Sequence, residues 1–213
     1  TLCLITLFLT SCLKKKLPEI KVPVIKNQKQ VRTTRYFSDL EFDGDLDVVI
    51  KPSKKGSSLI LQGDSRDLAF TTSTIKDGRL SVEIPEHYLR HGPIKATVYA
   101  NKLNRLAFNG NGNIEAKKLT ASNMALELYI NGKVNLSGKL NLKEIKVTGK
   151  NTIKLKHITS NNLNIVMNGD SDLTMQGVVN LKKLRAAGLG KVSLYWIDSP
   201  DLEIEGHDKV KIY

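Results

Sequence analysis

The chain has 213 residues, with 33 basic and 21 acidic side chains and a formal net charge of +12. Its two cysteines are Cys3 and Cys12, which excludes a disulfide framework or a cysteine-based metal site in the rest of the chain. A net charge this positive favours anionic partners such as nucleic acid, acidic polysaccharide or lipid head groups.

The first twelve residues are typical of an export signal. Thr1 to Ser11 are apolar and uncharged, and they are too few to span a bilayer as a helix, which needs about 20 residues. The segment Leu9-Thr10-Ser11-Cys12 resembles a bacterial lipobox, in which Cys12 is diacylated and becomes the first residue of the mature protein. We therefore interpret residues 1–12 as a clipped lipoprotein signal peptide and lipobox, with a buried cysteine as the alternative. A lipid anchor at Cys12 would hold the protein on a membrane of the bacterial cell envelope.

Residues 13–35 are interpreted as a flexible basic tether. They contain Pro18, Pro23 and the run Lys14-Lys15-Lys16, with little periodic apolar content. Beside a lipid anchor, the lysine run would also contact anionic head groups.

Residues 36–100 alternate between apolar and polar side chains in several short segments, such as "LEFDGDLDVVI" and "IKATVYA". Alternation with a period of two is typical of strands with one buried face. No segment after the tether has clear helical periodicity. The sequence therefore predicts one all-β domain over residues 36–213, within the normal size of a single domain.

From Leu103 onward, one apolar pattern occurs six times at intervals of 18 to 20 residues. Each copy has an apolar anchor, with further apolar residues two places after it and six and eight places before it. The anchors are Ile114, Val134, Ile153, Leu173, Val192 and Val210. Because mostly polar residues separate the apolar ones, each copy is expected to hold two short strands.

A glycine corner separates the two strands of each copy, as at Gly110, Gly132 and Gly149. A fixed period with one corner per copy predicts a parallel solenoid of about 18–20 residues per coil, since no copy can bury its apolar face alone. The alternative is an antiparallel β-sandwich, because segments such as "INGKVNL" are also typical of β-hairpins. The identical apolar slots in every copy favour the solenoid.

The corners "NGNGNI" and "AGLGKV" resemble the repeats of a bacterial family, the head GIN domain, which is labelled an auto-transporter adhesin. The segments "FSDLEFDGDLDVVI" and "DGRLSVEI" resemble the usual opening of this family, so the resemblance covers residues 36–213. It implies a right-handed parallel β-helix, and it implies no settled activity. The corners here use Asn, Lys and Asp where the family usually has Gly-Ser-Gly, so the resemblance does not extend to a shared ligand.

The positions that should point outward on the second strand of each copy are rich in lysine. If the register is right, one face of the domain is basic and the opposite face is near neutral. An exported protein would meet an anionic polysaccharide or lipid there, and no nucleic acid is expected as a partner. The alternative is a solvated surface, since lysine also discourages edge pairing. The candidate ligand-binding residues are Lys117, Lys133, Lys154, Lys156, Lys191, Lys209 and Lys211.

An enzyme is the competing class of function, because some β-helices cleave polysaccharides with grouped acids or a bound metal. The acids at Asp64 and Asp67 and at Asp170 and Asp172 are the candidates, and no nucleophile motif or zinc spacing accompanies them. The four histidines share no slot of the pattern; they are His87, His91, His157 and His207. We therefore predict no catalytic residue, no metal site and no cofactor.

The sequence as a whole predicts a lipid-anchored, non-enzymatic protein of the bacterial cell envelope or cell surface. Its repetitive basic face would serve adhesion or the binding of anionic envelope polymers or lipids. A purely structural envelope protein is the alternative, and a polysaccharide-acting β-helix enzyme is less favoured. Because fold alone does not determine function, the basic face carries this prediction.

Overall fold

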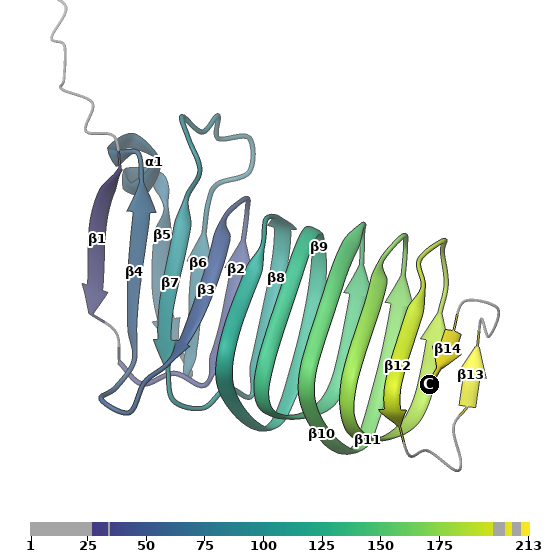
Figure 1. The fold of residues 1–213 in the computed structure, drawn as a ribbon. Coiled ribbons are helices and arrows are strands. Elements are labelled where there is room, and N and C mark those ends of the chain that lie inside the picture. The colour runs from purple at the N-terminus through teal and green to yellow at the C-terminus, as the bar shows by residue number, and fades with distance from the viewer. Residues whose placement is uncertain (1–26, 34, 198–202, 206–209) are drawn as a thin grey trace, which may run out of the picture.

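A computed structural model describes residues 27–33, 35–197, 203–205 and 210–213 (Figure 1). Across these residues the chain forms one sheet of fourteen strands and a six-residue helix. The first half of the chain holds β1 (Gln28–Thr33), β2 (Asp39–Asp43), β3 (Asp47–Pro52), β4 (Ser58–Gly63), α1 (Ser65–Phe70), β5 (Thr72–Lys76), β6 (Arg79–Glu83) and β7 (Lys95–Ala100). The second half holds β8 (Arg105–Asn111), β9 (Ile114–Thr148), β10 (Asn151–Asn168), β11 (Asp172–Ala186), β12 (Val192–Ile197), β13 (Glu203–Glu205) and β14 (Val210–Ile212).

The sheet has two sections that differ in strand direction. In the N-terminal section, which we define as residues 27–100, β4 pairs antiparallel with β1 and β7, and β5 pairs antiparallel with β6. In the periodic section, defined as residues 105–212, the described strands pair in parallel. The two sections join through the parallel pairs of β2 with β8 and of β3 with β9.

Long, bent strands form the periodic section. β9, β10 and β11 each curve round at one side of the molecule, so the sheet has two walls joined by a bend (Figure 1). Residues one period apart lie side by side: Ile153 pairs with Val134 on one side and with Leu173 on the other. The same register continues to Val192 and Val210.

The apolar core lies between the two walls. Alternation along each strand turns every second side chain inward, so equivalent slots in successive periods stack in the interior. Inward side chains that are no more than 1% exposed include Ile114, Val134, Ile153, Leu173 and Val192 from one wall, and Leu106, Leu126, Ile145, Ile165 and Leu184 from the other.

The predicted right-handed parallel β-helix is wrong as the fold class. The structure is a mixed sheet that curls into a half-barrel, with antiparallel pairs in the N-terminal section. Apolar alternation indicates which side chains point inward, but it carries no information on the direction of the neighbouring strand. The antiparallel sandwich is met only in part, because the described antiparallel pairs lie in the N-terminal section alone.

The N-terminal section also contains elements that the sequence pattern did not predict. Asp64 caps α1, and its carboxylate accepts a hydrogen bond from the backbone N–H of Arg66. The helix connects β4 in one wall to β5 in the other and buries Leu68 in the core. β1 lies within residues 13–35, the span interpreted as a tether, and pairs with β4 along its length. In the described part of the chain, no helix has the length and apolar character needed to cross a membrane.

Candidate functional site

The outward side chains on one wall of the periodic section form a basic surface, which we call the lysine face. It consists of the exposed side chains of residues 114–117, 133–137, 152–156, 172–176 and 191–195 together with Lys211. Six of the seven predicted lysines lie there and are exposed: Lys117, Lys133, Lys154, Lys156, Lys191 and Lys211. Lys209 lies outside the described residues.

A groove of about 200 Å³ runs across this face between β9 and β10. Lys117, Lys154 and Lys156 line it together with Glu115 and Asn135. The Nζ atom of Lys117 lies 2.8 Å from a carboxylate oxygen of Glu115, and this contact raises the pKa of Lys117 and lowers the pKa of Glu115. Among the residues that the structure describes, no carboxylate forms an ion pair with Lys154 or Lys156. The groove therefore offers two unpaired positive charges to a ligand.

Neutral residues separate the lysines within each row of the face. Lys154 pairs with Asn135 and Thr174, and Lys156 pairs with Ser137 and Gln176. Neighbouring strands lie about 4.8 Å apart, so Lys117 and Lys156, two strands apart in one row, are separated by about 10 Å. The positive charge is thus spaced rather than continuous.

The corners of the sheet are joined by a ladder of hydrogen bonds between side chains. The amides of Asn109, Asn111 and Asn113 donate to Asp43, Asp45 and Asp47 at 3.1, 2.6 and 2.8 Å. One period later, Asn131 donates to Asn111 at 3.1 Å, and the backbone N–H of Lys133 donates to Asn113 at 3.1 Å. Two short segments of the sequence, "DGDLD" and "NGNGN", therefore match residue for residue in space.

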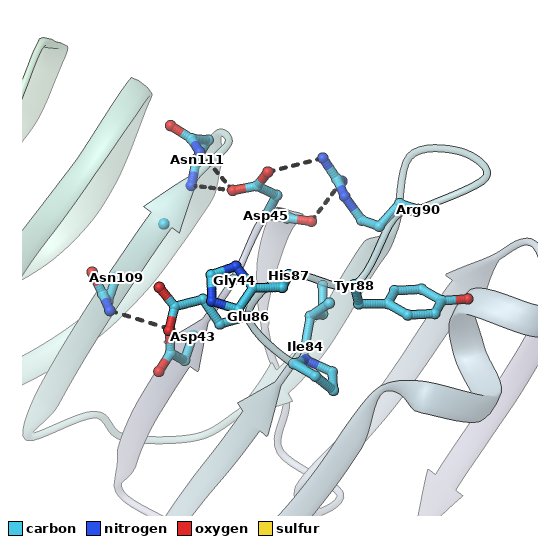
Figure 2. Close-up of a pocket in the computed structure, with 12 residues that line it drawn as sticks. Asp43, Gly44, Asp45, Ile84, Glu86, His87, Tyr88, Arg90, Asn109 and Asn111 are labelled. Atoms are coloured by element: carbon cyan, nitrogen blue, oxygen red, sulfur yellow. Dashed lines mark hydrogen bonds and ion pairs between the residues drawn. The ribbon is translucent and has the colours of Figure 1, made fainter.

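Beside this ladder is a cavity of about 440 Å³, between the ladder and the loop that connects β6 to β7 (Figure 2). Asp43, Asp45 and Glu86 give it an acidic lining. Asp45 lies between Asn111 and Arg90, with 3.0 Å from the guanidinium to the carboxylate (Figure 2). The carboxylates of Asp43 and Asp45 already accept hydrogen bonds from protein donors. A structural role in joining the corners therefore accounts for both residues without a ligand.

A buried carboxylate fastens the β6–β7 loop to α1. Asp67 is fully buried, and its oxygens accept hydrogen bonds from the Tyr88 hydroxyl at 3.0 Å and the Gly92 backbone N–H at 3.0 Å. The backbone N–H of His91 donates to both oxygens, and Nδ1 of His91 lies 2.8 Å from Oδ1. Burial alone would raise the pKa of Asp67, but the hydrogen bonds from His91, Tyr88 and Gly92 outweigh it, and the pKa is lowered. We call this arrangement the Asp67 clamp.

The geometry of the clamp bears on metal binding, because Asp64, Asp67 and His91 have potential ligand atoms within 4.8 Å of one another. Asp64 forms a two-point ion pair with Arg66, which lowers the pKa of Asp64 to about 2. With the oxygens of Asp67 occupied by N–H and O–H donors, both carboxylates are already paired with the protein. These three residues therefore form a structural clamp rather than an open site for a cation.

The other residues weighed as catalytic groups are dispersed. Asp170 and Asp172 accept hydrogen bonds from the backbone N–H groups of Leu189 and Lys191, as corner residues do. His157 is exposed on β10, whereas His207 lies outside the described residues. The structure thus brings together Asp64, Asp67 and His91 but joins none of them to the acids at the β10–β11 corner.

Comparison with known proteins identifies the family. Residues 36–212 match the family described as "Putative auto-transporter adhesin, head GIN domain". The chain belongs to the head GIN domain family. The resemblance inferred from the glycine corners and the opening segment is therefore confirmed, while the lipobox at Cys12 lies outside the described residues.

Solved crystal structures are similar to this chain, and the one with a TM-score above 0.5 supports its fold. One from Bacteroides fragilis, described as a putative adhesin, has a TM-score of 0.63 and 17% identity over 88% of this chain and 94% of that chain. Two others with the same description come from Parabacteroides distasonis and Parabacteroides merdae. They have TM-scores of 0.49 and 0.47 and identities of 15% and 17%, and each covers 88% of this chain, with 93% and 95% of those chains covered. No functionally curated protein matches the chain.

Sequence reasoning located the lysine face but missed the clamp and the acidic cavity. The lysine positions follow from the period of two, which the repeated anchors make unambiguous. The cavity had a signal in the alternating acids of "DGDLD", and the matching "NGNGN" lies 66 residues later. The clamp had none, because Asp67 meets Tyr88 and His91 only through the folded β6–β7 loop.

Proposed function

We propose that this head GIN domain is a non-enzymatic, adhesin-type binding module of the bacterial cell envelope, anchored by a lipid on Cys12. Its lysine face would bind an anionic polymer. The observation that carries the proposal is the groove between β9 and β10, where Lys154 and Lys156 lie without ion-pair partners among the described residues. Membership of the family supports an adhesive role at the cell surface.

The spacing of the lysines favours a particular kind of polymer. Within a row, basic side chains recur at every second or third strand, a separation of about 10 to 14 Å. An acidic polysaccharide with one carboxylate per disaccharide distributes its charge over comparable intervals, whereas a polyphosphate carries charge on every unit. Each contact would be weak and sensitive to salt, since exposed charges are screened beyond about 8 Å at physiological ionic strength. Affinity would come from several contacts together.

The test is retention of the chain on immobilised hyaluronan, which has one carboxylate per disaccharide, across a salt series. The variant carries Lys133→Glu, Lys154→Glu, Lys156→Glu and Lys191→Glu, and we expect it to lose retention while remaining folded. Four exposed lysines outside the face provide a control with the same change in net charge: Lys102→Glu, Lys139→Glu, Lys143→Glu and Lys182→Glu. This control should keep most of its retention.

Two outcomes would overturn the proposal. Equal losses in the two variants would mean that retention follows net charge, and the lysine face would then be only a solvated surface. Unchanged retention of the lysine-face variant would exclude the face as the binding site. Stronger retention on polyphosphate or on anionic vesicles than on hyaluronan would reassign the ligand to a phosphate-bearing polymer or lipid.

The lipid anchor is tested separately in cells. Expression with a labelled fatty acid should give labelled protein for the parent chain and unlabelled protein for Cys12→Ala. Continued labelling of Cys12→Ala would exclude Cys12 as the site of lipid attachment without affecting the assignment of the lysine face.

A further inference from the structure

One end of the molecule carries two apolar side chains that the fold leaves uncovered. Leu89 lies at the tip of the β6–β7 loop and is 88% exposed, and Phe70 at the end of α1 is 55% exposed. The rings of Phe70 and Tyr88 pack against each other at a tilt of 34° with their centroids 4.7 Å apart, so the end of the helix and the loop together present an apolar tip. We call it the apolar tip and define it as Phe70, Tyr88 and Leu89.

The Asp67 clamp holds this tip in place. Tyr88, which precedes Leu89, donates to the buried carboxylate, and the backbone N–H groups of His91 and Gly92 donate to it from the other side of Leu89. The backbone on both sides of Leu89 is therefore fastened to α1, and the helix is in turn held by Leu68 in the core. Because the backbone around Leu89 is already ordered, contact with an apolar partner would cost little further conformational entropy.

The chain enters the sheet at the same end. Gln28, the first residue of β1, pairs with Gly63, the last residue of β4, and α1 begins two residues after Gly63. The guanidinium of Arg32 also donates to the backbone oxygen of Leu68 in α1. Figure 1 shows α1 and the β6–β7 loop together at the end opposite the C-terminus. Fifteen residues separate Cys12 from Gln28, so even a fully extended link spans at most about 58 Å.

We propose that the apolar tip inserts into the interfacial region of the lipid bilayer and sets the orientation of the domain. This inference rests on the proposed lipid anchor, which would bring the bilayer to this end of the molecule. Two arginines near the tip are paired with acids, Arg66 with Asp64 and Arg90 with Asp45, so the contact is driven by burial of Leu89 and Phe70. The lysine face, which lies on the periodic section, would then remain accessible.

The experiment attaches the chain to vesicles in a way that does not depend on lipidation. The full chain, with Cys12→Ser and an N-terminal hexahistidine, is bound to vesicles of phosphatidylcholine, phosphatidylglycerol and a nickel-chelating lipid. Leu89→Trp is the reporter, and Leu189→Trp is the matched control, because Leu189 is 81% exposed at a corner of the periodic section. The spectrum of the parent chain, which contains Trp196, is subtracted from each.

We expect the emission of Leu89→Trp to shift to shorter wavelength on vesicles and to be quenched by brominated lipid, and Leu189→Trp to show neither change. Adding Phe70→Ser should reduce the quenching at position 89. Unchanged emission at position 89 in protein that sediments with the vesicles would overturn the proposal, as would equal changes at 89 and 189. A shift that needs no vesicles and grows with protein concentration would assign the tip to contact with a second copy instead. Because the hexahistidine replaces the lipid, a failure of Cys12 to be acylated in cells is a separate result.

Discussion

The two sections of the sheet solve the same packing problem in different ways. In the periodic section, residues 18 to 20 positions apart pair in parallel, so each inward slot packs against its own equivalent. In the N-terminal section, β4 runs antiparallel to β1 and β7 whereas β7 runs parallel to β3, and a helix connects the two walls. Repetition gives the periodic section a uniform core, whereas the N-terminal section depends on specific polar contacts such as the Asp67 clamp.

The two sections also differ in their balance of acidic and basic side chains. Residues 36–100 contain ten acidic and eight basic side chains, while residues 101–197 contain five acidic and fifteen basic ones. A repeated slot multiplies whatever residue type it holds, so a preference for lysine at outward positions becomes an extended face. An irregular section brings different residue types together instead, as in the acidic cavity. Repeated surface charge and converging polar contacts therefore occupy separate parts of one sheet.

The largest expected effect comes from a charge in the uniform core. Ile153 is fully buried between Val134 and Leu173, so Ile153→Asp would bury an unpaired carboxylate. We expect it to lower the free energy of unfolding by several kcal/mol, on the order of 4, and to unfold neighbouring strands together. Urea denaturation followed by circular dichroism measures this. Lys154→Ala, one residue away and exposed, should change it by less than about 0.5 kcal/mol.

The sequence carried enough information to predict the inward and outward register of the periodic section. Ile114, Val134 and Ile153 are buried as their shared slot predicted, and Lys154 and Lys156 are exposed. The same alternation misled the prediction of fold class. A strand such as β4 alternates in the same way whether its neighbour is parallel or antiparallel, so its direction depends on contacts far apart in the sequence.

Two local signals in the N-terminal section were present but were outweighed by the period-two pattern. Asp77 and Gly78 form the turn between β5 and β6, with φ of 51° and 73°, and Asp-Gly between alternating segments favours such a hairpin. Asp64 before α1 is a typical helix N-cap. The helix has only six residues, which is too short for a helical period to appear in the sequence.

The second prediction tests how closely the corners of the periodic section are packed. A Cβ atom on Gly132 would overlap the backbone oxygen of Gly112, one period away. Gly132→Ala should therefore lower the free energy of unfolding by about 1 to 3 kcal/mol, because the backbone must move to make room. Gly92→Ala is the matched control in the N-terminal section, since a Cβ there meets no atom within 4 Å. Similar midpoints for the two variants in urea would contradict close stacking of the corners.

The third prediction concerns the polar contact on which the N-terminal section depends. Asp67→Asn replaces a buried carboxylate that accepts hydrogen bonds from Tyr88, His91 and Gly92, and it should lower the free energy of unfolding by about 1 to 3 kcal/mol. Because the pKa of Asp67 is lowered in the folded state, its contribution is present above the ordinary value of 3.8 and is lost as the pH falls through the lowered pKa. Limited proteolysis near neutral pH should cut the β6–β7 loop faster in the variant. Equal cleavage rates would mean that the clamp does not hold the loop.

The smallest expected effect is at the junction of the two sections, where Arg105 on β8 links them. Its guanidinium forms a two-point contact with Glu127 on β9, at 2.8 and 3.2 Å, and lies 3.8 Å from Glu41 on β2. The hydrogen bond from Arg105 lowers the pKa of Glu127 below its ordinary value of 4.5. The stabilisation from this pair is therefore present above pH 4.5 and is lost as the pH falls through the lowered pKa. Glu127→Gln should therefore lower the free energy of unfolding by about 1 kcal/mol near neutral pH, and the difference from the parent should shrink as the pH falls through the lowered pKa of Glu127. Urea denaturation over a pH series measures both, with Glu144→Gln as the control because its pair with Lys146 is more exposed. A difference that does not change with pH, or a larger effect at Glu144, would mean that the ion pair between Arg105 and Glu127 does not stabilise the fold.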